Sequence, residues 1–529
     1  MVQLDEFNNF KENFLVSKRY WLLYLIFITI LGLSTVNKNN ILHPKFEILI
    51  FLIVALLGIF CIVYYFMHNS DEELYKVALV IILIFGVICS LTVPILNHID
   101  ENEHFVRAEI TSQGVIFPDW IGDEKGINRL YNHTSGEISD EVNPGVGFNT
   151  IESLRFFKQN KGSTIFQVDG LDTMKINQSV YLHGSAFEQN PFYGYLPQAI
   201  GIFFAKLLDL NVIWLLWLGR IFNLIFYAIL VSLAVKKAPC LKLPLICVAC
   251  IPVSIYHASS VSIDPMIFGL GLLTISYFMY LYSSEEESLG NRHIAIFSVI
   301  CLLLGLCKLP YLAFIFLLLF IPKKNFKEYN LLLIFLGILF VGIIGVIWSR
   351  YSTPTLMHSW RSNLNYINST QQIAFLKNNP LQILEFLKHT VTGGLSFIIS
   401  QLFNFDYRNA ESIARYTFIS ILLAAFLAIF LFAYPNDFKF DLKGKLGVFI
   451  IFLIIYYGTY FVQLLTWAYV GNMYVDVHMR YFIPLLALIP IFIQIKNNPF
   501  KRETFDKYAF VFIIGFMAVF ILALATKYY

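Results

Sequence analysis

Charged residues are scarce in this chain of 529 residues, which contains only 38 Lys and Arg and 35 Asp and Glu side chains. They make up 14% of the sequence, whereas hydrophobic residues make up 57% and aromatic residues 17%. A soluble domain could not bury that much apolar surface. The composition therefore excludes an ordinary soluble protein and indicates a polytopic membrane protein that resides in a lipid bilayer.

Dense blocks of Lys and Arg are also lacking, and the formal net charge is only +3. Without such a block there is no cationic stripe to follow a phosphate backbone, so nucleic acid is excluded as a partner. Cysteines are few: the seven lie mostly within apolar runs, and no pair has metal-ligand spacing in a polar loop. We expect them to be small buried hydrophobic side chains.

Long apolar runs are abundant, and many reach the roughly 20 residues that cross a bilayer. They are continuously apolar and do not alternate, which predicts helices and not a barrel. The run 294–322 is interrupted by Lys308 and Pro310, so it forms either two short halves or one kinked span. We expect an all-α polytopic fold with about thirteen transmembrane helices, at 20–36, 47–67, 76–97, 211–235, 243–258, 264–282, 294–307, 309–322, 330–348, 413–433, 446–466, 480–495 and 507–526.

Lys and Arg in the short loops predict the orientation, with the N-terminus in the cytoplasm. One assignment satisfies all the basic loops, provided that residues 193–210 form a helix at the outer surface and do not cross. Strand-like stretches around 163–182 predict a small extracytoplasmic insert. The expected organisation is an N-terminal segment with three spans (1–97), a first extracytoplasmic loop with juxtamembrane helices (98–210), central spans (211–348), a second extracytoplasmic loop (349–412) and C-terminal spans (413–529).

Titratable residues gather where the third expected span ends, in "NHIDENEHFVRAE" at 97–109. In a helix, Asp100, His104 and Arg107 would lie on one face at three- and four-residue spacing. A carboxylate beside a His and an Arg suits a general base, a metal site or a phosphate clamp, and a solvated helix cap is the alternative. Asp100, Glu101 and His104 would suit Mg or Mn, although nothing in the sequence requires a divalent metal.

Further polar residues lie at the expected outer ends of other spans. Asp264-Pro265 predicts a helix start with Asp264 as N-cap. Cations beside a carboxylate group would suit an anionic lipid, and the candidates to bind its phosphate are Lys308, Arg480 and Arg350. His257 and His478 lie in the same outer turns. Aromatic rings suited to a sugar come from Tyr193, Tyr195, Trp360 and Trp467, for which an interfacial aromatic belt is the alternative interpretation.

The stretch "DENEHFVRAEITSQGVIFP" (100–118) resembles the pattern Asp-Glu-x-x-His-Phe-x-Arg-Ala of an uncharacterised bacterial membrane family, domain of unknown function 2142. Further matching stretches follow in the same order: "YGYLPQAIGIFFAKLLDL", "WLGRIFNLIFYAIL", "ASSVSIDPM", "CKLPY" and "RYFIPLL". The family looks like a branch of the type C glycosyltransferases. Two extra spans before the motif, and the lack of a Pro within it, depart from the family pattern.

The resemblance implies a glycosyltransferase of the bacterial cytoplasmic membrane that moves a sugar from a polyprenyl-phosphate donor to an extracytoplasmic acceptor. The acceptor would be a cell-envelope glycan or glycolipid, and transfer would be inverting. The resemblance makes Asp100 the expected base, with Glu101 as the adjacent alternative. Expected substrate contacts are His104, Arg107, Tyr195, His257, Asp264, Lys308, His478 and Arg480. A transporter or flippase for the same lipid, using an intramembrane charge such as Arg220, is the alternative, and a non-catalytic scaffold is a third.

Overall fold

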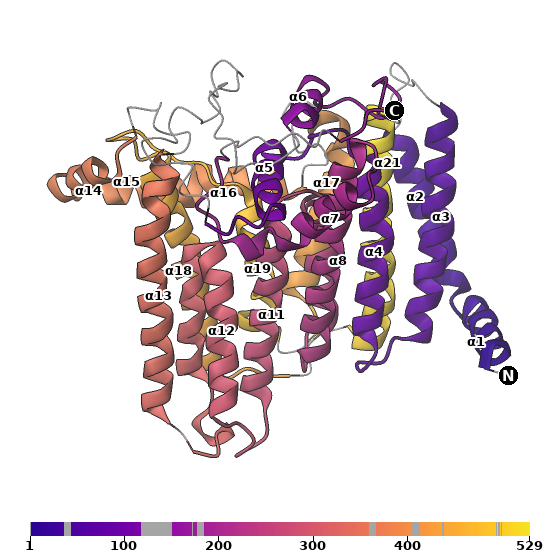
Figure 1. The fold of residues 1–529 in the computed structure, drawn as a ribbon. Helices are drawn as coiled ribbons and strands as arrows, with labels where there is room; N and C mark the ends of the chain where they lie inside the picture. The colour runs from indigo at the N-terminus through magenta and orange to yellow at the C-terminus, as the bar shows by residue number, and fades with distance from the viewer. Residues whose placement is uncertain are drawn as a thin grey trace.

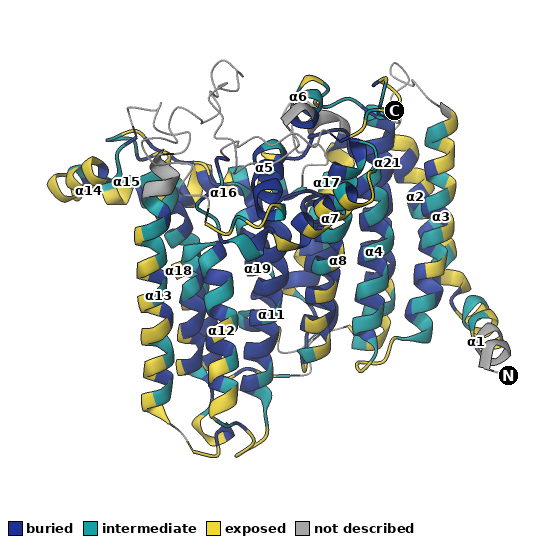
Figure 2. Ribbon diagram, viewed as in Figure 1, coloured by how far each residue is buried: buried dark blue, intermediate teal, exposed yellow. Residues whose placement is uncertain are grey.

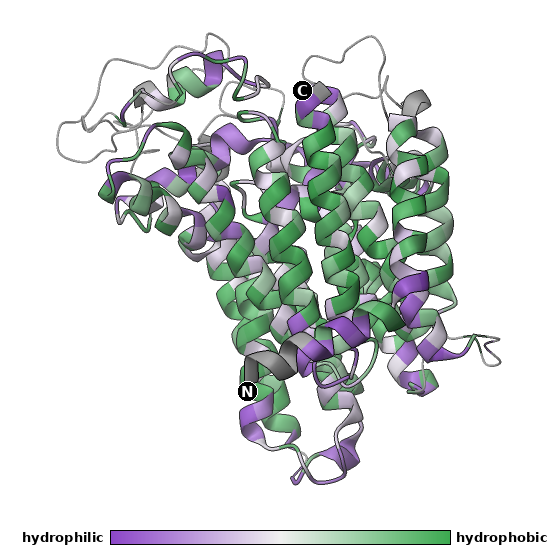
Figure 3. Ribbon diagram, turned by 90° about the vertical axis from the view of Figure 1, so that its right-hand side faces the viewer, coloured by the Kyte–Doolittle hydropathy of each residue, from purple (hydrophilic) through white to green (hydrophobic). Residues whose placement is uncertain are grey.

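The long apolar runs form long helices that pack side by side, as seen in a computed structural model of the chain (Figure 1). The structure describes residues 2–35, 44–117, 151–171, 173–176, 185–328, 330–358, 367–403, 413–435, 438–493, 495, 498 and 500–529. A hydrophobic band covers the middle of the bundle and polar residues collect at both ends, which is the pattern of a protein that crosses a membrane (Figure 3).

Within the described residues, seven helices are long and apolar enough to cross a membrane. Their bounds are α3 (Pro44–Met67), α4 (Leu74–Thr92), α8 (Ile213–Lys237), α11 (Asp264–Ser283), α13 (Leu331–His358), α18 (Leu442–Thr466) and α21 (Arg502–Tyr528). An eighth span is formed if α1 (Val2–Val16) and α2 (Lys18–Thr35), which meet at a 65° bend, are counted together. The all-helical membrane fold is thus confirmed for the described residues.

The expected number of about thirteen spans is not confirmed, because five expected spans are short or broken. The run 243–258 is divided at Pro252 into α9 (Lys242–Cys250) and α10 (Pro252–Ala258). The run 480–495 forms η9 (Met479–Phe482), α19 (Ile483–Leu486) and α20 (Ile489–Phe492), each of four residues. The expected span at 413–433 is α17 (Ile413–Phe432), whose apolar described part has 17 residues.

The run 294–322 forms two elements and not one kinked span. The chain reverses at Lys308 between α12 (Asn291–Cys307) and the 3-10 helix η4 (Leu309–Phe320), and the two pack against each other. Gly305 permits this close approach, since a Cβ there would lie 2.1 Å from the Leu312 side chain. A short 3-10 turn, η5 (Lys323–Asn325), follows.

Several short helices lie at one end of the bundle, called the site end below (Figure 1). They are α5 (Glu101–Ser112), α6 (Ile151–Gln159), η3 (Phe192–Gly194), α7 (Leu196–Leu207), α14 (Ser369–Asn378), α15 (Gln382–His389), the π-helical turn η7 (Thr390–Gly394) and α16 (Leu395–Phe403). As expected for 193–210, α7 has 12 residues and is not among the candidate spans. The expected strand-like insert is not observed in the described residues, where Lys175 and Asn211 form only an isolated bridge.

The centre of the packed interior is α8, which contacts α4, α7 and α11. Buried residues run along the inner faces of these helices, whereas α13 is exposed along most of its length (Figure 2). Gly201 of α7 lets that helix lie directly on α8, because a Cβ at this position would lie 2.2 Å from the Leu218 carbonyl oxygen. The core therefore holds the site end of α4, α8 and α11 in one rigid arrangement.

Candidate functional site

The corner between α4 and α5 carries the acidic stretch. Pro94 follows the end of α4, and α5 begins at Glu101 with Asp100 as its N-cap residue. Asp100 has a φ of 58°, in the left-handed region that Asp and Asn tolerate better than most residues. The expected helix is therefore present, but Asp100 and Glu101 lie on either side of its start and point to different partners.

Glu101 is sealed inside the protein by Arg220 of α8. Arg220 donates to the two Glu101 carboxylate oxygens at 2.8 and 2.7 Å, and both side chains are 0% exposed. The same guanidinium donates to three carbonyl oxygens at the end of α4, those of Ser90, Val93 and Pro94. Arg220 thereby binds the α4–α5 corner to α8. Glu101 lines neither of the two cavities at the site end.

Asp100 instead faces a cavity and contacts Arg480 of η9. Its carboxylate accepts a hydrogen bond from Arg480 Nη2 at 2.7 Å, and its side chain is 46% exposed. Arg480 Nη1 lies 3.5 Å from the Asp264 carboxylate at the start of α11. The buried Arg480 Nε has no hydrogen-bond partner among the described residues. Arg480 thus joins two carboxylates and retains one N–H that could bind a further oxygen.

Burial by itself raises the pKa of the Asp100 carboxyl, but the adjacent Arg480 guanidinium outweighs that effect and holds the pKa below its usual value. The carboxylate is therefore ionised at neutral pH while it is paired with Arg480. An anion bound to Arg480 would weaken this pairing and make Asp100 a stronger base.

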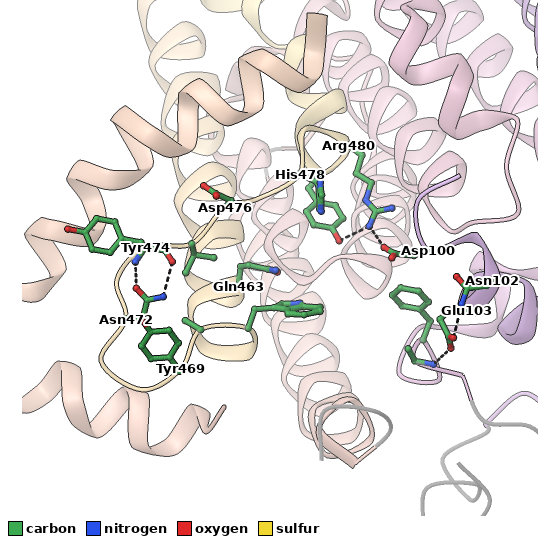
Figure 4. A pocket seen from close by; sticks show the side chains of 16 residues that line it. Asp100, Asn102, Glu103, Gln463, Tyr469, Asn472, Tyr474, Asp476, His478 and Arg480 are labelled. Atoms are coloured by element: carbon green, nitrogen blue, oxygen red, sulfur yellow. Dashed lines mark hydrogen bonds and ion pairs between the residues drawn. The ribbon is translucent and has the colours of Figure 1, made fainter. Parts of the chain in front are cut away.

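A cavity of about 700 Å³ opens beside Asp100 and Arg480 (Figure 4). Asp100, Arg480 and His478 lie together on one part of its wall, and Glu103 lies beyond Asp100 (Figure 4). The opposite wall carries polar and aromatic side chains that include Gln463, Trp467, Tyr469, Asn472, Tyr474 and Asp476. A space of this size, with a carboxylate, a cation and aromatic rings, suits a sugar-sized polar ligand.

A smaller cavity of about 180 Å³ adjoins the first, because Arg480, Tyr481 and Trp467 line both. Its other lining residues include His104, Asp264 and Lys308, together with Trp348, Ser352 and Thr353 of α13. Lys308 Nζ lies 3.2 Å from the centre of the Tyr481 ring, so a cation is placed at this cavity. The sequence-predicted cations Lys308 and Arg480 are thus brought together at one site.

Three histidines predicted from the sequence lie near the Asp100 and Asp264 carboxylates. His104 is stacked on Phe187 and hydrogen-bonded to Tyr195 Oη at 2.7 Å, and burial lowers the pKa of its imidazole to about 4. His257 Nδ1 lies 3.6 Å from the Asp264 carboxylate. His478 accepts a hydrogen bond from Gln401 Nε2 at 3.0 Å, and burial together with the Arg480 charge lowers its pKa to about 4. His104 and His478 are therefore neutral at physiological pH.

Arg107 and Tyr195 lie behind the cavities and support them. Arg107 donates to Thr111 Oγ1 at 2.7 Å, and its guanidinium lies 5.5 Å from the centre of the Tyr195 ring. Tyr195 is fully buried and hydrogen-bonded to both His104 and Asn190. Neither residue lines the two cavities, so the structure places them as a supporting layer and not at the cavity surface.

The remaining predicted residues are distributed differently. Asp264 is the first residue of α11, with Ile263 as N-cap, so the predicted cap is displaced by one residue. Arg350 is exposed on α13 and lines neither cavity. Trp360 lies outside the described residues. No group of three potential metal ligands was found in the described part of the chain, since Glu101 faces Arg220 and His104 bonds Tyr195.

Two further residues of the site, Tyr481 and Gln401, were not among the residues predicted from the sequence. Tyr481 lies under Lys308 and contacts Arg480 through its hydroxyl at 3.4 Å, but it follows Arg480 in an aromatic stretch typical of any span. Gln401 fixes both His478 and the Met479 backbone N–H, at 3.0 and 2.8 Å. It was overlooked in an apolar run, where an isolated amide is a signal of an internal hydrogen bond.

Comparison with known proteins gives one result. The profile of a family described as "Predicted membrane protein (DUF2142)" matches residues 83–489, which is more than half of the chain. The matched range contains all the site residues from Asp100 to Arg480. No significant match was found among curated proteins or among solved structures.

Proposed function

We propose, from the premise that the chain belongs to the DUF2142 family of predicted membrane proteins, that it is an integral-membrane glycosyltransferase of the type C kind. It would take a sugar from a polyprenyl-phosphate donor and transfer it to a glycan or glycolipid acceptor. The observation that carries the proposal is the contact of Asp100 with Arg480 at 2.7 Å on the wall of a cavity of about 700 Å³. A carboxylate and a cation at a sugar-sized cavity are the two charges that glycosyl transfer needs.

Each charge has a defined role in the proposed reaction. The acceptor hydroxyl oxygen attacks the anomeric carbon and forms the new bond, while its proton passes to Asp100. The bond between the anomeric carbon and the phosphate oxygen breaks, and the lipid phosphate leaves with its electron pair. Arg480 and Lys308 stabilise the charge that develops on this phosphate. Direct attack by the acceptor inverts the anomeric configuration.

Binding of the donor would also activate the base. In the structure Arg480 holds Asp100 as a paired carboxylate with a lowered pKa. A donor phosphate at the unpartnered Nε of Arg480 would compete for the guanidinium and release Asp100 towards the acceptor. Proton removal would then follow donor binding, which limits wasteful attack by water.

The competing proposal, a lipid transporter or flippase, drew on Arg220 as an intramembrane charge. Arg220 is fully engaged by Glu101 and three backbone carbonyls, so this charge gives the transporter no support. The distribution of Lys and Arg would place the site on the extracytoplasmic face of a bacterial cytoplasmic membrane.

The test uses purified protein in proteoliposomes with radiolabelled polyprenyl-phosphate sugars and an acceptor lipid extract. We expect transfer by wild type and a loss on the order of 10²–10⁴-fold in Asp100→Asn, because a general base is removed. Asn tolerates the left-handed backbone of this position, so the fold is retained. Asp209→Asn is the matched control, since Asp209 also has a left-handed backbone, with a φ of 46°, and lines neither cavity. Label that only changes leaflet would identify a flippase, and full transfer by Asp100→Asn would refute the assigned base.

A further inference from the structure

The segment from α14 to α16 presents an apolar face to no other part of the described protein. Leu381 is 77% exposed, Leu384 63% and Val391 54%. Leu384 belongs to α15, and Leu381 and Val391 lie just before and just after it. This helix is strongly amphipathic: Phe386 is buried, whereas Glu385 and His389 bond residues 474 and 475. Large exposed apolar side chains on a short amphipathic helix are typical of an element that lies in a lipid interface.

The position of the segment supports a lipid partner. Figure 1 shows α14 and α15 at the site end, transverse to α13, with α14 projecting outward past α13. Residues of α14 and α15 face Tyr457, Gly458, Phe461 and Leu464 of α18 across an apolar cavity of about 310 Å³. These four belong to the last turns of a candidate membrane span that ends at Thr466. The segment therefore lies at the depth of one lipid leaflet, and not above the membrane.

A second element at the same edge, α13, is also apolar and exposed. Only 17% of the apolar window of α13 is buried inside the protein, and side chains such as Val346 and Ile347 are 62% and 58% exposed. Helices α14 and α15 also carry exposed residues (Figure 2). Lys377 and Lys388 are exposed on the same segment and suit the phosphate level of a leaflet.

The opposite side of the segment holds one wall of the larger cavity, residues 471–478, called the wall segment. Gln372 of α14 accepts from Gly471 N at 2.8 Å and donates to the Asn472 carbonyl at 3.3 Å. His389 at the end of α15 is hydrogen-bonded to the Val475 carbonyl at 3.1 Å. The Tyr474 hydroxyl bonds Glu385. Each of α14 and α15 therefore has one side towards the wall segment and another side that is bare.

We propose that α14, α15 and η7 form a docking element embedded in the lipid leaflet at the site end, and that the leaflet thereby holds the wall segment in place. The partner is the lipid surface itself, recognised by the apolar side chains Leu381, Leu384 and Val391. The wall of the cavity is complete only when this element is seated in lipid. The inference stands apart from the proposed chemistry, because it depends on no donor, acceptor or proton transfer.

The first test measures lipid contact by site-directed labelling. The seven native cysteines are buried, so a thiol-reactive fluorophore reports on an introduced cysteine. Leu381→Cys and Leu384→Cys are labelled in lipid nanodiscs that contain nitroxide lipids. Val346→Cys on α13 is the positive control, and Glu286→Cys, exposed in the loop between α11 and α12 and outside the candidate spans, is the negative control. We expect quenching at Leu381 and Leu384 to match Val346. Quenching no greater than at Glu286 would overturn the proposal.

The second test measures the coupling to the wall segment by hydrogen exchange in nanodiscs without nitroxide. Leu381→Asn/Leu384→Asn changes two exposed side chains, so the fold does not depend on them. We expect the amides of 471–478 to exchange several-fold faster in this variant, while those of α5 are unchanged. Unchanged exchange in the wall segment would show that lipid seating does not hold the cavity wall. Neither test uses a sugar donor, so failure here leaves the proposed glycosyl transfer separately testable.

Discussion

Glu101 and Arg220 form a two-point ion pair that is closed to water, with oxygen to nitrogen distances of 2.8 and 2.7 Å. Because Arg220 also collects three carbonyls from the end of α4, the pair joins α4, α5 and α8 at one point. Asp100, one residue before Glu101, is held at the cavity by this junction. A carboxylate next to the candidate base is therefore a structural group.

The first prediction is that Glu101→Gln and Arg220→Met each lower stability by about 3–5 kcal/mol, because each leaves a buried charge without its partner. The double substitution removes both charges and is expected to be less damaging than the sum of the single ones. Thermal unfolding in nanodiscs measures the three variants. Additive losses would show that the two side chains are not coupled. Transfer activity of Glu101→Gln should follow the folded fraction, which a catalytic Glu101 would not do.

How far the sequence predicts this site depends on the kind of contact. Long apolar runs depend only on local composition, so α3, α4, α8 and α11 were expected close to their observed positions. Charges at the ends of apolar runs are conspicuous, so the sequence also singles out Asp100, Lys308 and Arg480, which line the two cavities. The contact between Asp100 and Arg480 was not predictable, since the two residues are separated by 380 positions and meet only through packing.

The short helices, in contrast to the long ones, could not be predicted from hydropathy. Hydropathy treats 309–322 and 480–495 as spans, but η4 is a 3-10 helix of 12 residues and 480–495 breaks into single turns. Prolines at 310, 484 and 490 lie in the first turns of these pieces and stop longer helices from forming. The sequence also could not show that Glu101 and Asp100 have different partners. The left-handed backbone at Asp100 turns its side chain towards Arg480, whereas Glu101 pairs with Arg220.

The second prediction concerns the phosphate contact of Arg480. Arg480→Lys keeps the charge but removes the forked geometry and the unpartnered Nε, so the donor KM should rise roughly 10-fold or more. Steady-state transfer in proteoliposomes measures this change. Arg350→Lys is the control, because Arg350 is exposed and lines neither cavity. Equal effects of the two substitutions would show that the donor does not distinguish Arg480 from a lipid-surface arginine.

The third prediction is a loss of stability in mild acid that arises from buried neutral histidines. His104 and His478 have pKa values of about 4 in the folded protein, below the usual value of roughly 6.5. The unfolded chain therefore binds more protons between these values, and stability falls as the pH is lowered through that range. Melting temperature in nanodiscs should decrease from pH 7 to pH 5.

The matched variants for this effect are His104→Gln and His293→Gln. His104→Gln removes one buried titrating group and should reduce the dependence of melting temperature on pH. His293→Gln changes a histidine at the start of α12, outside the site, and should retain the wild-type dependence. If both variants retained it, the acid effect would have to come from other groups.

The fourth prediction is that a bound lipid phosphate raises the pKa of Asp100. Arg480 depresses this pKa in the ligand-free protein, so the carboxyl should become protonated only below the usual Asp value of roughly 3.9. A phosphate on Arg480 neutralises part of the guanidinium charge and adds a negative charge nearby, and both changes favour the protonated carboxyl. Infrared difference spectroscopy can follow the protonated carboxyl band, which is identified by its absence in Asp100→Asn.

The titration is made with and without a short-chain prenyl phosphate, at a fixed ionic strength. The band should appear at higher pH when the prenyl phosphate is present. Arg480→Lys should reduce the difference between the two titrations, because the lysine cannot bond Asp100 and phosphate in the same way. A band that titrates at the same pH in both conditions would mean that the phosphate does not reach Arg480. A carboxylate whose proton affinity rises only when the donor is bound can act as a base after the leaving group is in place.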